Sequence, residues 1–364
     1  MIRQTTGKER NKLKKKIAGL LVSIITAAVV LSGCGIIDGG AKTKFSDQYF
    51  DVFDTVVSVT AYCKDRKGFD AVNTELHDTL KHYHQLFDIY NEYDGMNNAA
   101  TINKLAGTGE LTEVEPALAE LIEYTRSMYV LTNGKVNAAM GAVLSLWHEA
   151  RTLSLDEPAK AYIPSTADLK DAAQHCSMDS VFVDMQNSRV SLDDPDMSLD
   201  LGAFAKGWAV EKAAQLLESK ADELAKQGVG GIIISAGGNV RMIGEKPEGT
   251  WTVAIQDPDS PDGSAYIAVI ENAKGSVVTS GAYQRYYEYN GKKYHHIIDG
   301  TTLMPEDRYL SVSVKTADSG YADALSTALF NMDLEESKAF AESLEGVEVL
   351  WVLPDRTMVK TAGW

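Results

Sequence analysis

The stretch "IIISAGGNVRMIG", residues 232–244, decides the fold class. An apolar run, the pair Gly237-Gly238 and a second apolar run predict a buried strand, a tight hairpin turn and a second strand. Strands joined by such a turn run antiparallel. The pair is not part of a G-x-G-x-x-G motif, and no Walker sequence occurs in the chain, so the glycines can be simply the hairpin turn.

Elements on both sides of this hairpin extend the pattern. Before it, the sequence predicts a strand at 52–62, helices at 66–87 and 116–134, a hairpin at 181–192 and a long helix at 204–227, with a polar connection at 88–109 and a charged, proline-containing loop after Trp147. After it come strands at 251–256, 266–271, 275–279, 283–289 and 310–316, helices near 320–331 and 335–344, and a last hairpin around 347–360. Because the strands cluster, we expect an α+β fold: a largely antiparallel sheet with packed helices, in two lobes of one unit.

Residues 1–33 have the composition of a lipoprotein signal peptide. Seven basic residues lie between Arg3 and Lys16, and an uncharged run follows as far as Ser32. This run is shorter than the roughly 20 residues that a membrane-spanning helix needs. "LSGC" at 31–34 resembles a bacterial lipobox, which implies cleavage before Cys34 and lipidation of its sulfur. The alternative is a plain signal anchor. We expect a lipid-anchored protein on the extracytoplasmic face of a cell membrane.

Composition limits what the remaining chain can do. We expect residues 34–44 to form a lipidated tether and residues 45–364 to form the folded domain. Without residues 1–33 the net charge falls from −16 to about −22, which argues against nucleic acid as a partner. Cys63 and Cys176 then remain; they could pair with each other or be buried thiols.

The stretch "YADALSTALF", residues 321–330, predicts an apolar helix that carries two polar groups on one face. Asp323 and Thr327 are four residues apart and therefore neighbours on the helix surface. Asp323 could cap the helix or form an ion pair, and Thr327 could bond back to the carbonyl of Asp323. The alternative is that the two oxygens hold a ligand.

"DLGAFAKGWA", residues 200–209, predicts the beginning of a helix. Gly202 allows another group to approach the backbone closely. Lys206 lies in the first turn, where a cation opposes the helix dipole unless an anion is near. It could also be no more than a solvated lysine.

"VVTSGAYQRYYEYNGKKYHHIIDG", residues 277–300, predicts a hairpin about its Asn-Gly pair. His295 and His296 follow on the returning strand and point to opposite faces. Asp299 comes at the end of that strand. A histidine here could be a general base, or a structural group that holds the loop.

Together with "FDTVVSVT" (53–60), "TNGKVNAAMGAVLSLW" (132–147) and the hairpin at 232–244, these stretches resemble the ApbE family, bacterial FAD:protein FMN transferases of the cell envelope. The resemblance runs from about residue 48 to 360. It implies a T-fold-like architecture. It also implies Mg²⁺-dependent transfer of FMN from FAD onto a Thr or Ser hydroxyl of an exported acceptor protein, with release of AMP.

The resemblance also implies which residues form the reaction centre. Asp323, Thr327 and the backbone carbonyl of Ala203 match the family's metal ligands, and Mg²⁺ prefers oxygen ligands. His296 is the implied base for the acceptor hydroxyl, and Asp299 helps to hold its loop.

The implied FAD contacts are Phe53, Tyr93, Gly134, Lys135, Val136, Asp200, Lys206 and Ile298. Tyr90 is the alternative to Tyr93. The chain departs from the family pattern at Phe53, where Met is common, at 136–137, which is Val-Asn in place of Phe-Asp, and at "IDGTTLMP" (298–305), in place of "IDPxTG". These departures weaken the local contacts that we infer and leave the metal pair intact.

Two other functions remain open. The same site could hydrolyse FAD to FMN and AMP, with water as the acceptor, or the chain could be a lipid-anchored flavin-binding protein without turnover. A flavin carrier would itself contain an SGAT- or SGAS-like acceptor motif. This chain has "TSGAY" (279–283), with Tyr283 at the acceptor position. We therefore expect the acceptor motif to lie on a separate exported protein.

Overall fold

The computed structural model describes residues 42–260 and 263–364. The expected signal peptide, Cys34 and most of the expected tether lie outside the described residues. Strand β1 begins at Thr43, so regular structure starts slightly before the expected domain boundary at residue 45. In the described part of the chain, no helix is both long enough and apolar enough to cross a membrane.

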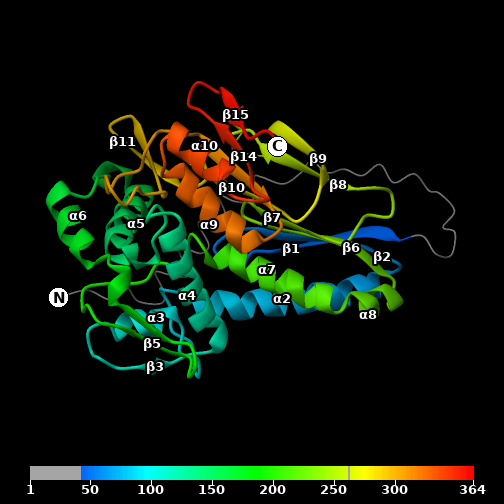
Figure 1. The fold of residues 1–364 in the computed structure, drawn as a ribbon, viewed down its shortest axis with the longest axis horizontal. Helices are drawn as coiled ribbons and strands as arrows, with labels where there is room; N and C mark the ends of the chain where they lie inside the picture. Colours follow the sequence, from blue (N-terminus) through cyan, green and yellow to red (C-terminus); the bar gives the residue numbers. More distant parts are fainter. Residues whose placement is uncertain (1–41, 261–262) are drawn as a thin grey trace.

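An eight-stranded sheet forms the centre of the molecule (Figure 1). Its strands, in order across the sheet, are β1 (Thr43–Tyr49), β2 (Val57–Cys63), β6 (Val229–Ala236), β7 (Asn239–Ile243), β10 (Ser276–Gly281), β13 (Ser311–Thr316), β14 (Glu348–Val352) and β15 (Met358–Lys360). Every neighbouring pair runs antiparallel, which confirms the predicted fold class. β1 was not predicted.

The hairpin that suggested this architecture joins β6 to β7. Ala236 pairs with Asn239, and Gly237 and Gly238 form the turn between them with φ of 52° and 95°. Such angles favour glycine at both positions. A Cβ on Gly237 would lie 2.3 Å from Thr55 Oγ1, so this turn packs directly on the loop that precedes β2.

Three long helices, α2 (Arg66–Phe87), α7 (Ala205–Ser219) and α9 (Ser319–Phe330), pack on one face of the sheet (Figure 1). A hairpin of β8 (Trp251–Gln256) and β9 (Tyr266–Ala273) covers part of the other face, where it forms a smaller apolar cluster. The helix predicted over 204–227 is wrong in one respect: it breaks at Lys220, and α8 (Ala221–Lys226) follows. The last helix, α10 (Leu334–Glu342), packs beside β14.

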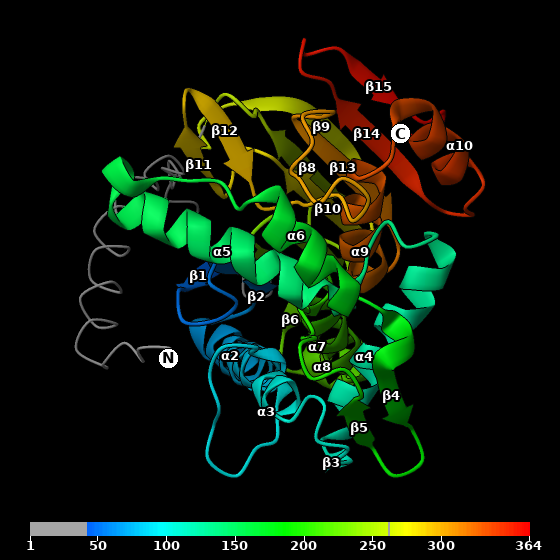
Figure 2. The same cartoon turned by 90° about the vertical axis from the view of Figure 1, so that its left-hand side faces the viewer.

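A second group of elements lies at one end of the sheet (Figure 2). It contains α3 (Ala99–Lys104), α4 (Pro116–Leu131), α5 (Gly141–Asp156), α6 (Thr166–Ala172), the small sheet of β3 (Thr112–Glu113), β5 (Arg189–Leu192) and β4 (Val181–Asp184), and the hairpin of β11 (Tyr286–Tyr289) and β12 (Lys292–His295). Short 3₁₀ turns lie at Ala138–Met140, Pro158–Lys160, Ala173–His175 and Met178–Ser180. The main apolar core runs from the large sheet into α3, α4 and the small sheet, in keeping with two lobes of one unit. Helices α5 and α6 and the β11–β12 hairpin form a smaller, separate apolar cluster.

Three local predictions were wrong. The polar connection at 88–109 contains α3, and the loop expected after Trp147 is the second half of α5, followed by α6. The strand expected at 52–62 begins only at Val57, because Phe53 and Asp54 adopt left-handed backbone angles that no strand allows.

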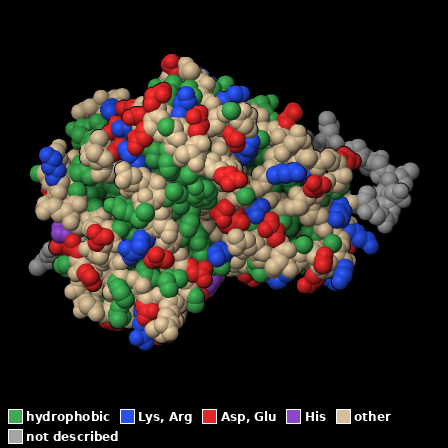
Figure 3. Space-filling model, viewed as in Figure 1, with side chains coloured by type: hydrophobic (Ala, Val, Ile, Leu, Met, Phe, Trp, Pro, Cys, Tyr) green, Lys and Arg blue, Asp and Glu red, His purple; other side chains and the backbone are tan. Residues whose placement is uncertain are grey.

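The two remaining cysteines are free thiols, which excludes a disulfide between them in this structure. Cys63 is buried on β2, and burial raises its pKa to about 11. On the face seen in Figure 3, acidic and basic side chains are interspersed, and hydrophobic side chains gather across the middle, where α4 and α9 lie in Figure 1.

Candidate functional site

The first turn of α7 meets α9 at a single close contact. Gly207 donates its N–H to Asp323 Oδ2 at 2.8 Å, and Lys206 Nζ lies 3.5 Å from the same oxygen. A Cβ on Gly207 would lie 2.4 Å from Asp323 Cβ, so only glycine permits this approach. The contact buries the Asp323 carboxylate, whose side chain is only 5% exposed, and holds it against the beginning of α7.

This contact leaves a backbone carbonyl free. In a regular helix, Gly207 N–H would donate to the carbonyl of Ala203, one turn earlier. Here that N–H is used by Asp323, and among the described residues no donor reaches the Ala203 carbonyl or Asp323 Oδ1. Two oxygen atoms from different elements are therefore available at one place.

Thr327 adds a third oxygen from α9. In the structure its hydroxyl forms no hydrogen bond back to the carbonyl of Asp323, which instead accepts from Ser326 Oγ at 2.9 Å. Its nearest hydroxyl neighbour is Ser280 Oγ on β10, at 3.5 Å. Carboxylate, carbonyl and hydroxyl oxygens are the donor types that Mg²⁺ takes, so the residues present fit such an ion. Their role as metal ligands stays a prediction.

His295 is the last residue of β12 and His296 follows the strand, and the two side chains have different surroundings. His295 is buried, its Nε2 lies 3.1 Å from the carbonyl of Glu306, and its ring packs edge-on against Phe330 at 5.5 Å. These contacts give His295 a structural role. His296 Nδ1 is buried without a hydrogen-bond partner in the described residues. Burial, then the charges of Arg285 and Arg151, hold the His296 pKa well below its usual range, so the ring is neutral at neutral pH.

Asp299 supports the loop that follows His296. Its Oδ1 accepts the N–H groups of Thr301 and Thr302 at 2.7 and 3.2 Å, and Arg308 binds its Oδ2 at 3.0 Å. Burial alone would raise the Asp299 pKa, but these hydrogen bonds and the arginine lower it overall. A carboxylate occupied in this way shapes the loop.

The predicted contacts Lys135 and Ile298 come together behind the end of α9. Asn331, the first residue after that helix, donates its amide to the carbonyls of Lys135 and Ile298 at 3.2 and 3.3 Å. Gly134, with φ of 78°, directs the chain into this segment, and Val136 is buried beside it. The segment 134–136 is thus tied to the helix that carries Asp323.

Asp200 and Lys206 flank the other side of the same region. Asp200 N–H donates to the carbonyl of Ala138 at 2.7 Å, and its Oδ1 accepts Gly202 N–H at 2.8 Å. Burial raises the Asp200 pKa. Lys206 Nζ donates to the carbonyl of Gly202 at 3.1 Å, so the lysine folds back over the turn and is mostly shielded from solvent.

The predicted contact Phe53 lies in a strained loop. Phe53 and Asp54 have φ of 53° and 48°, which is uncommon for two successive residues other than glycine. His84 Nδ1 accepts Phe53 N–H at 3.2 Å, and Arg285 Nη2 binds the carbonyl of Asp54 at 3.0 Å. Thus the loop brings Arg285 from the β10–β11 connection to the segment before β2.

The two candidate tyrosines have different neighbours. Tyr93 donates its hydroxyl to Asp88 at 2.9 Å and lies within its own loop. Tyr90 is 55% exposed and stacks on His148 of α5, with ring centroids 5.1 Å apart. Partial desolvation and the charges of Asp200 and Asp54 raise the Tyr90 pKa to about 12, against the opposing charges of Arg151 and Arg285. The structure thus links Tyr90, rather than Tyr93, to the region around Asp200.

His148 and Arg151 were missed by the sequence prediction. Arg151 Nη2 lies 3.0 Å from His148 Nδ1, so the ring accepts at that atom. Burial and then Arg151 lower the His148 pKa. The signal that could have found them is their spacing of three on a helix, which requires α5 to be predicted beyond Trp147.

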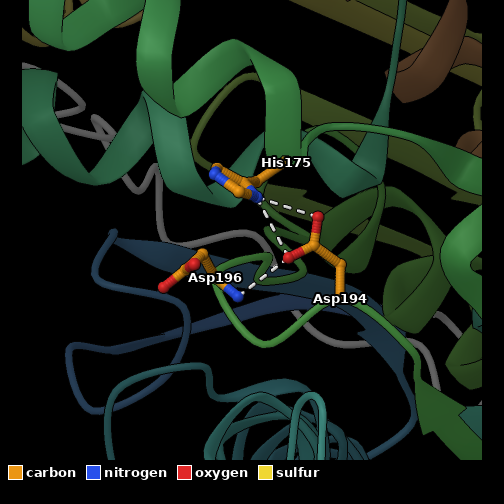
Figure 4. A group of neighbouring side chains, drawn as sticks. All are labelled: His175, Asp194 and Asp196. Carbon is orange, nitrogen blue, oxygen red and sulfur yellow. Dashed lines mark hydrogen bonds and ion pairs between the residues drawn. The ribbon is translucent and has the colours of Figure 1, made fainter.

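A separate cluster of His175, Asp194 and Asp196 could also hold a metal ion (Figure 4). His175 Nδ1 lies 2.8 Å from Asp194 Oδ2, and Asp196 N–H donates to Asp194 Oδ1 at 2.9 Å. The hydrogen bond between His175 and Asp194 raises the pKa of His175. Because these bonds already satisfy the histidine and the first carboxylate, the cluster is explained as an ion pair with a turn.

Comparisons with known proteins give one consistent result. The sequence profile of the ApbE family matches residues 53–351. The chain is 32% identical over 350 residues to the FAD:protein FMN transferase of Treponema pallidum (strain Nichols). The alignment covers 92% of this chain and 91% of that protein. It is 30% identical over 280 residues to the protein of the same name from Klebsiella pneumoniae (strain 342), with 76% and 82% covered.

Solved structures agree with the sequence comparison. The crystal structure of the ApbE protein of Thermotoga maritima matches with a TM-score of 0.75 and 26% identity, over 88% of this chain and 98% of that one. The flavin transferase ApbE from Vibrio cholerae matches with a TM-score of 0.70 over 88% and 97%, and at 24% identity this likeness shows the fold.

Proposed function

Because the chain belongs to the ApbE family, we propose that it transfers FMN from FAD onto the hydroxyl of a Thr or Ser residue in an exported acceptor protein. The observation that carries the proposal is the contact between Gly207 and Asp323. It leaves Asp323 Oδ1 and the Ala203 carbonyl without a donor among the described residues, and Thr327 adds a hydroxyl one turn further along α9.

The proposed reaction exchanges one phosphorus–oxygen bond for another. The acceptor oxygen forms a bond to the phosphorus of the FMN half, and the anhydride bond between the two phosphates breaks. AMP leaves with the bridging oxygen. A neutral ring nitrogen of His296 takes the proton from the acceptor hydroxyl. The low pKa of His296 supports this role, because the ring is available as a base at neutral pH.

Mg²⁺, held by Asp323, Thr327 and the Ala203 carbonyl, would neutralise negative charge on the diphosphate. Other residues of the chain hold the carboxylate and the base in position. Gly207 N–H occupies Asp323 Oδ2 and holds the carboxylate in place, which leaves Oδ1 for the ion. Asp299 and Arg308 hold the loop after His296, which keeps the base in place.

The test is to incubate the purified protein with FAD, Mg²⁺ and a peptide that bears an SGAT-like sequence. Mass spectrometry of the peptide should show the gain expected for FMN less water, and AMP should appear in equal amount. AMP and free FMN without the gain would overturn the transferase proposal in favour of FAD hydrolysis. FAD that stays intact would overturn it in favour of flavin binding without turnover.

One substitution tests whether the transfer takes place at Asp323. Asp323→Ala should lose most of the transfer and its dependence on Mg²⁺, because one ligand is gone. Asp259→Ala is the matched control: this carboxylate is exposed and pairs with Arg356 on the other side of the sheet. Turnover at the wild-type rate in Asp323→Ala would contradict the assignment of the site.

We propose further that the protein is lipid-anchored at the extracytoplasmic face of a membrane. The support is the sequence of residues 1–34, with its basic segment, apolar run and Cys34. Cys34→Ala should abolish incorporation of labelled fatty acid and release the mature domain from the membrane fraction. A Cys34→Ala protein that stays in the membrane fraction as wild type does would instead indicate a plain signal anchor.

A further inference from the structure

Arg151 and Arg285 are exceptional among the arginines that the structure describes. Arg66, Arg126, Arg189, Arg241, Arg308 and Arg356 each form an ion pair with a carboxylate. Neither Arg151 nor Arg285 has a carboxylate partner within the described residues, although the whole chain carries a net charge of −16. Within residues 42–260 and 263–364, these two guanidinium groups alone have no carboxylate partner, which suits them to bind another anion.

The two arginines act on the same place from different elements. Arg151 lies on α5, and Arg285 lies between β10 and β11, anchored to the Asp54 carbonyl. After burial, the charge of Arg285 is the main influence that lowers the Arg151 pKa, and both lower the pKa of His296. The charges of Asp200 and Asp54 partly offset this repulsion, but neither carboxylate forms an ion pair with either arginine. A bound anion beside the buried, unpartnered His296 nitrogen would therefore stabilise both cations.

The surroundings fix Arg151 in one orientation. Its Nη2 lies 3.0 Å from His148 Nδ1, and the His148 ring is covered by Tyr90. A guanidinium held by a neutral ring keeps its remaining N–H groups free for bidentate binding of phosphate oxygens. His148 is therefore a positioning residue for Arg151.

We infer that Arg151 and Arg285 bind the diphosphate of the dinucleotide beside His296. This inference rests on the proposed function for the identity of the ligand. Lys206 is a third cation near both groups: it lies 3.5 Å from Asp323 Oδ2, and its charge also lowers the pKa of His296. The diphosphate would thus meet three cationic groups near the base.

Binding of ADP and of adenosine to the purified protein tests the inference, because the two probes differ only in the diphosphate. Arg151→Gln and Arg285→Gln should each weaken ADP binding by about tenfold to a hundredfold, which is the range for a charged hydrogen bond, and should leave adenosine binding unchanged. Arg151→Lys should recover part of the loss. The loss should shrink as ionic strength rises.

Arg189→Gln is the matched control, because Arg189 pairs at 3.9 Å with Glu113 on the small sheet. It should bind both probes as wild type does. Unchanged ADP affinity in both site variants would overturn the inference, and so would an equal loss for adenosine, which indicates a structural role. Unchanged ADP affinity with weakened use of the acceptor peptide would assign the pair to an acidic acceptor instead.

The inference and the proposed function fail separately. If the wild type attaches no FMN to any peptide and yet loses ADP binding in the arginine variants, the transferase proposal fails and the diphosphate site stands. If transfer occurs and neither arginine variant changes ADP binding, the diphosphate site fails and the transferase proposal stands.

Discussion

At the scale of single residues, the candidate site depends on which polar atoms are used and which are free. The sequence alone placed Asp323 and Thr327 on one helix face, because a spacing of four residues does so in any helix. It could not show that Gly207 N–H turns from the Ala203 carbonyl to Asp323, because that depends on how two distant helices meet. The free oxygens are a property of the fold.

His296 predicts how activity depends on pH. A base must be unprotonated, so kcat/KM falls as the pH drops through its pKa in the free enzyme. Burial, Arg285 and Arg151 lower that pKa, so the acid limb should lie below pH 6.5, the ordinary value for histidine. Arg285→Gln removes one repelling charge and should move the limb to higher pH. We expect His296→Gln to lose the limb together with most of the transfer. A limb above pH 6.5 in the wild type would exclude His296 as the base.

At the scale of elements, the contact between α7 and α9 and the position of α5 set the geometry. The helices at 66–87 and 320–331 and the hairpins were predictable, since their apolar residues follow regular periods. α5 was not, because the residues that it buries after Trp147 are the small side chains Ala150 and Ser154, among charged neighbours. Missing the second half of α5 meant missing His148 and Arg151.

The close approach of α7 and α9 can be tested by one methyl group. Gly207→Ala places a Cβ only 2.4 Å from Asp323 Cβ, so the helices must separate, at a cost of about 1–3 kcal/mol in folding free energy. Metal-dependent transfer should fall sharply although no ligand is removed. Gly68→Ala on α2 is the control, because its Cβ would make only ordinary contacts of 3.4 Å or more. Equal activity in both variants would show that the contact does not position Asp323.

At the scale of the whole molecule, the two lobes share one core and are joined by polar contacts. Asn103 of α3 bonds both the carbonyl and the N–H of Leu199, and the N–H of Asp200 reaches Ala138. The segment that leads into α7 is therefore held by the neighbouring lobe. The antiparallel class followed from clustered strands, whereas the order of strands across the sheet depends on long-range pairing that the sequence does not display.

This shared core predicts a single cooperative unfolding transition in calorimetry. FAD with Mg²⁺ should raise its midpoint, because ligands that bind only the folded state stabilise it by about 2.7 kcal/mol at a hundredfold excess over Kd. The part of the shift that needs Mg²⁺ should vanish in Asp323→Ala. Two separate transitions, with only one moved by ligand, would show that the lobes unfold independently.

The most direct test of the central claim is the position of a bound metal ion. Crystals of the protein grown with FAD and Mn²⁺, a substitute for Mg²⁺ with an anomalous signal, should show a peak within bonding distance of Asp323 Oδ1, Thr327 Oγ1 and the Ala203 carbonyl. A peak only at the cluster of His175, Asp194 and Asp196, with none between α7 and α9, would contradict the account.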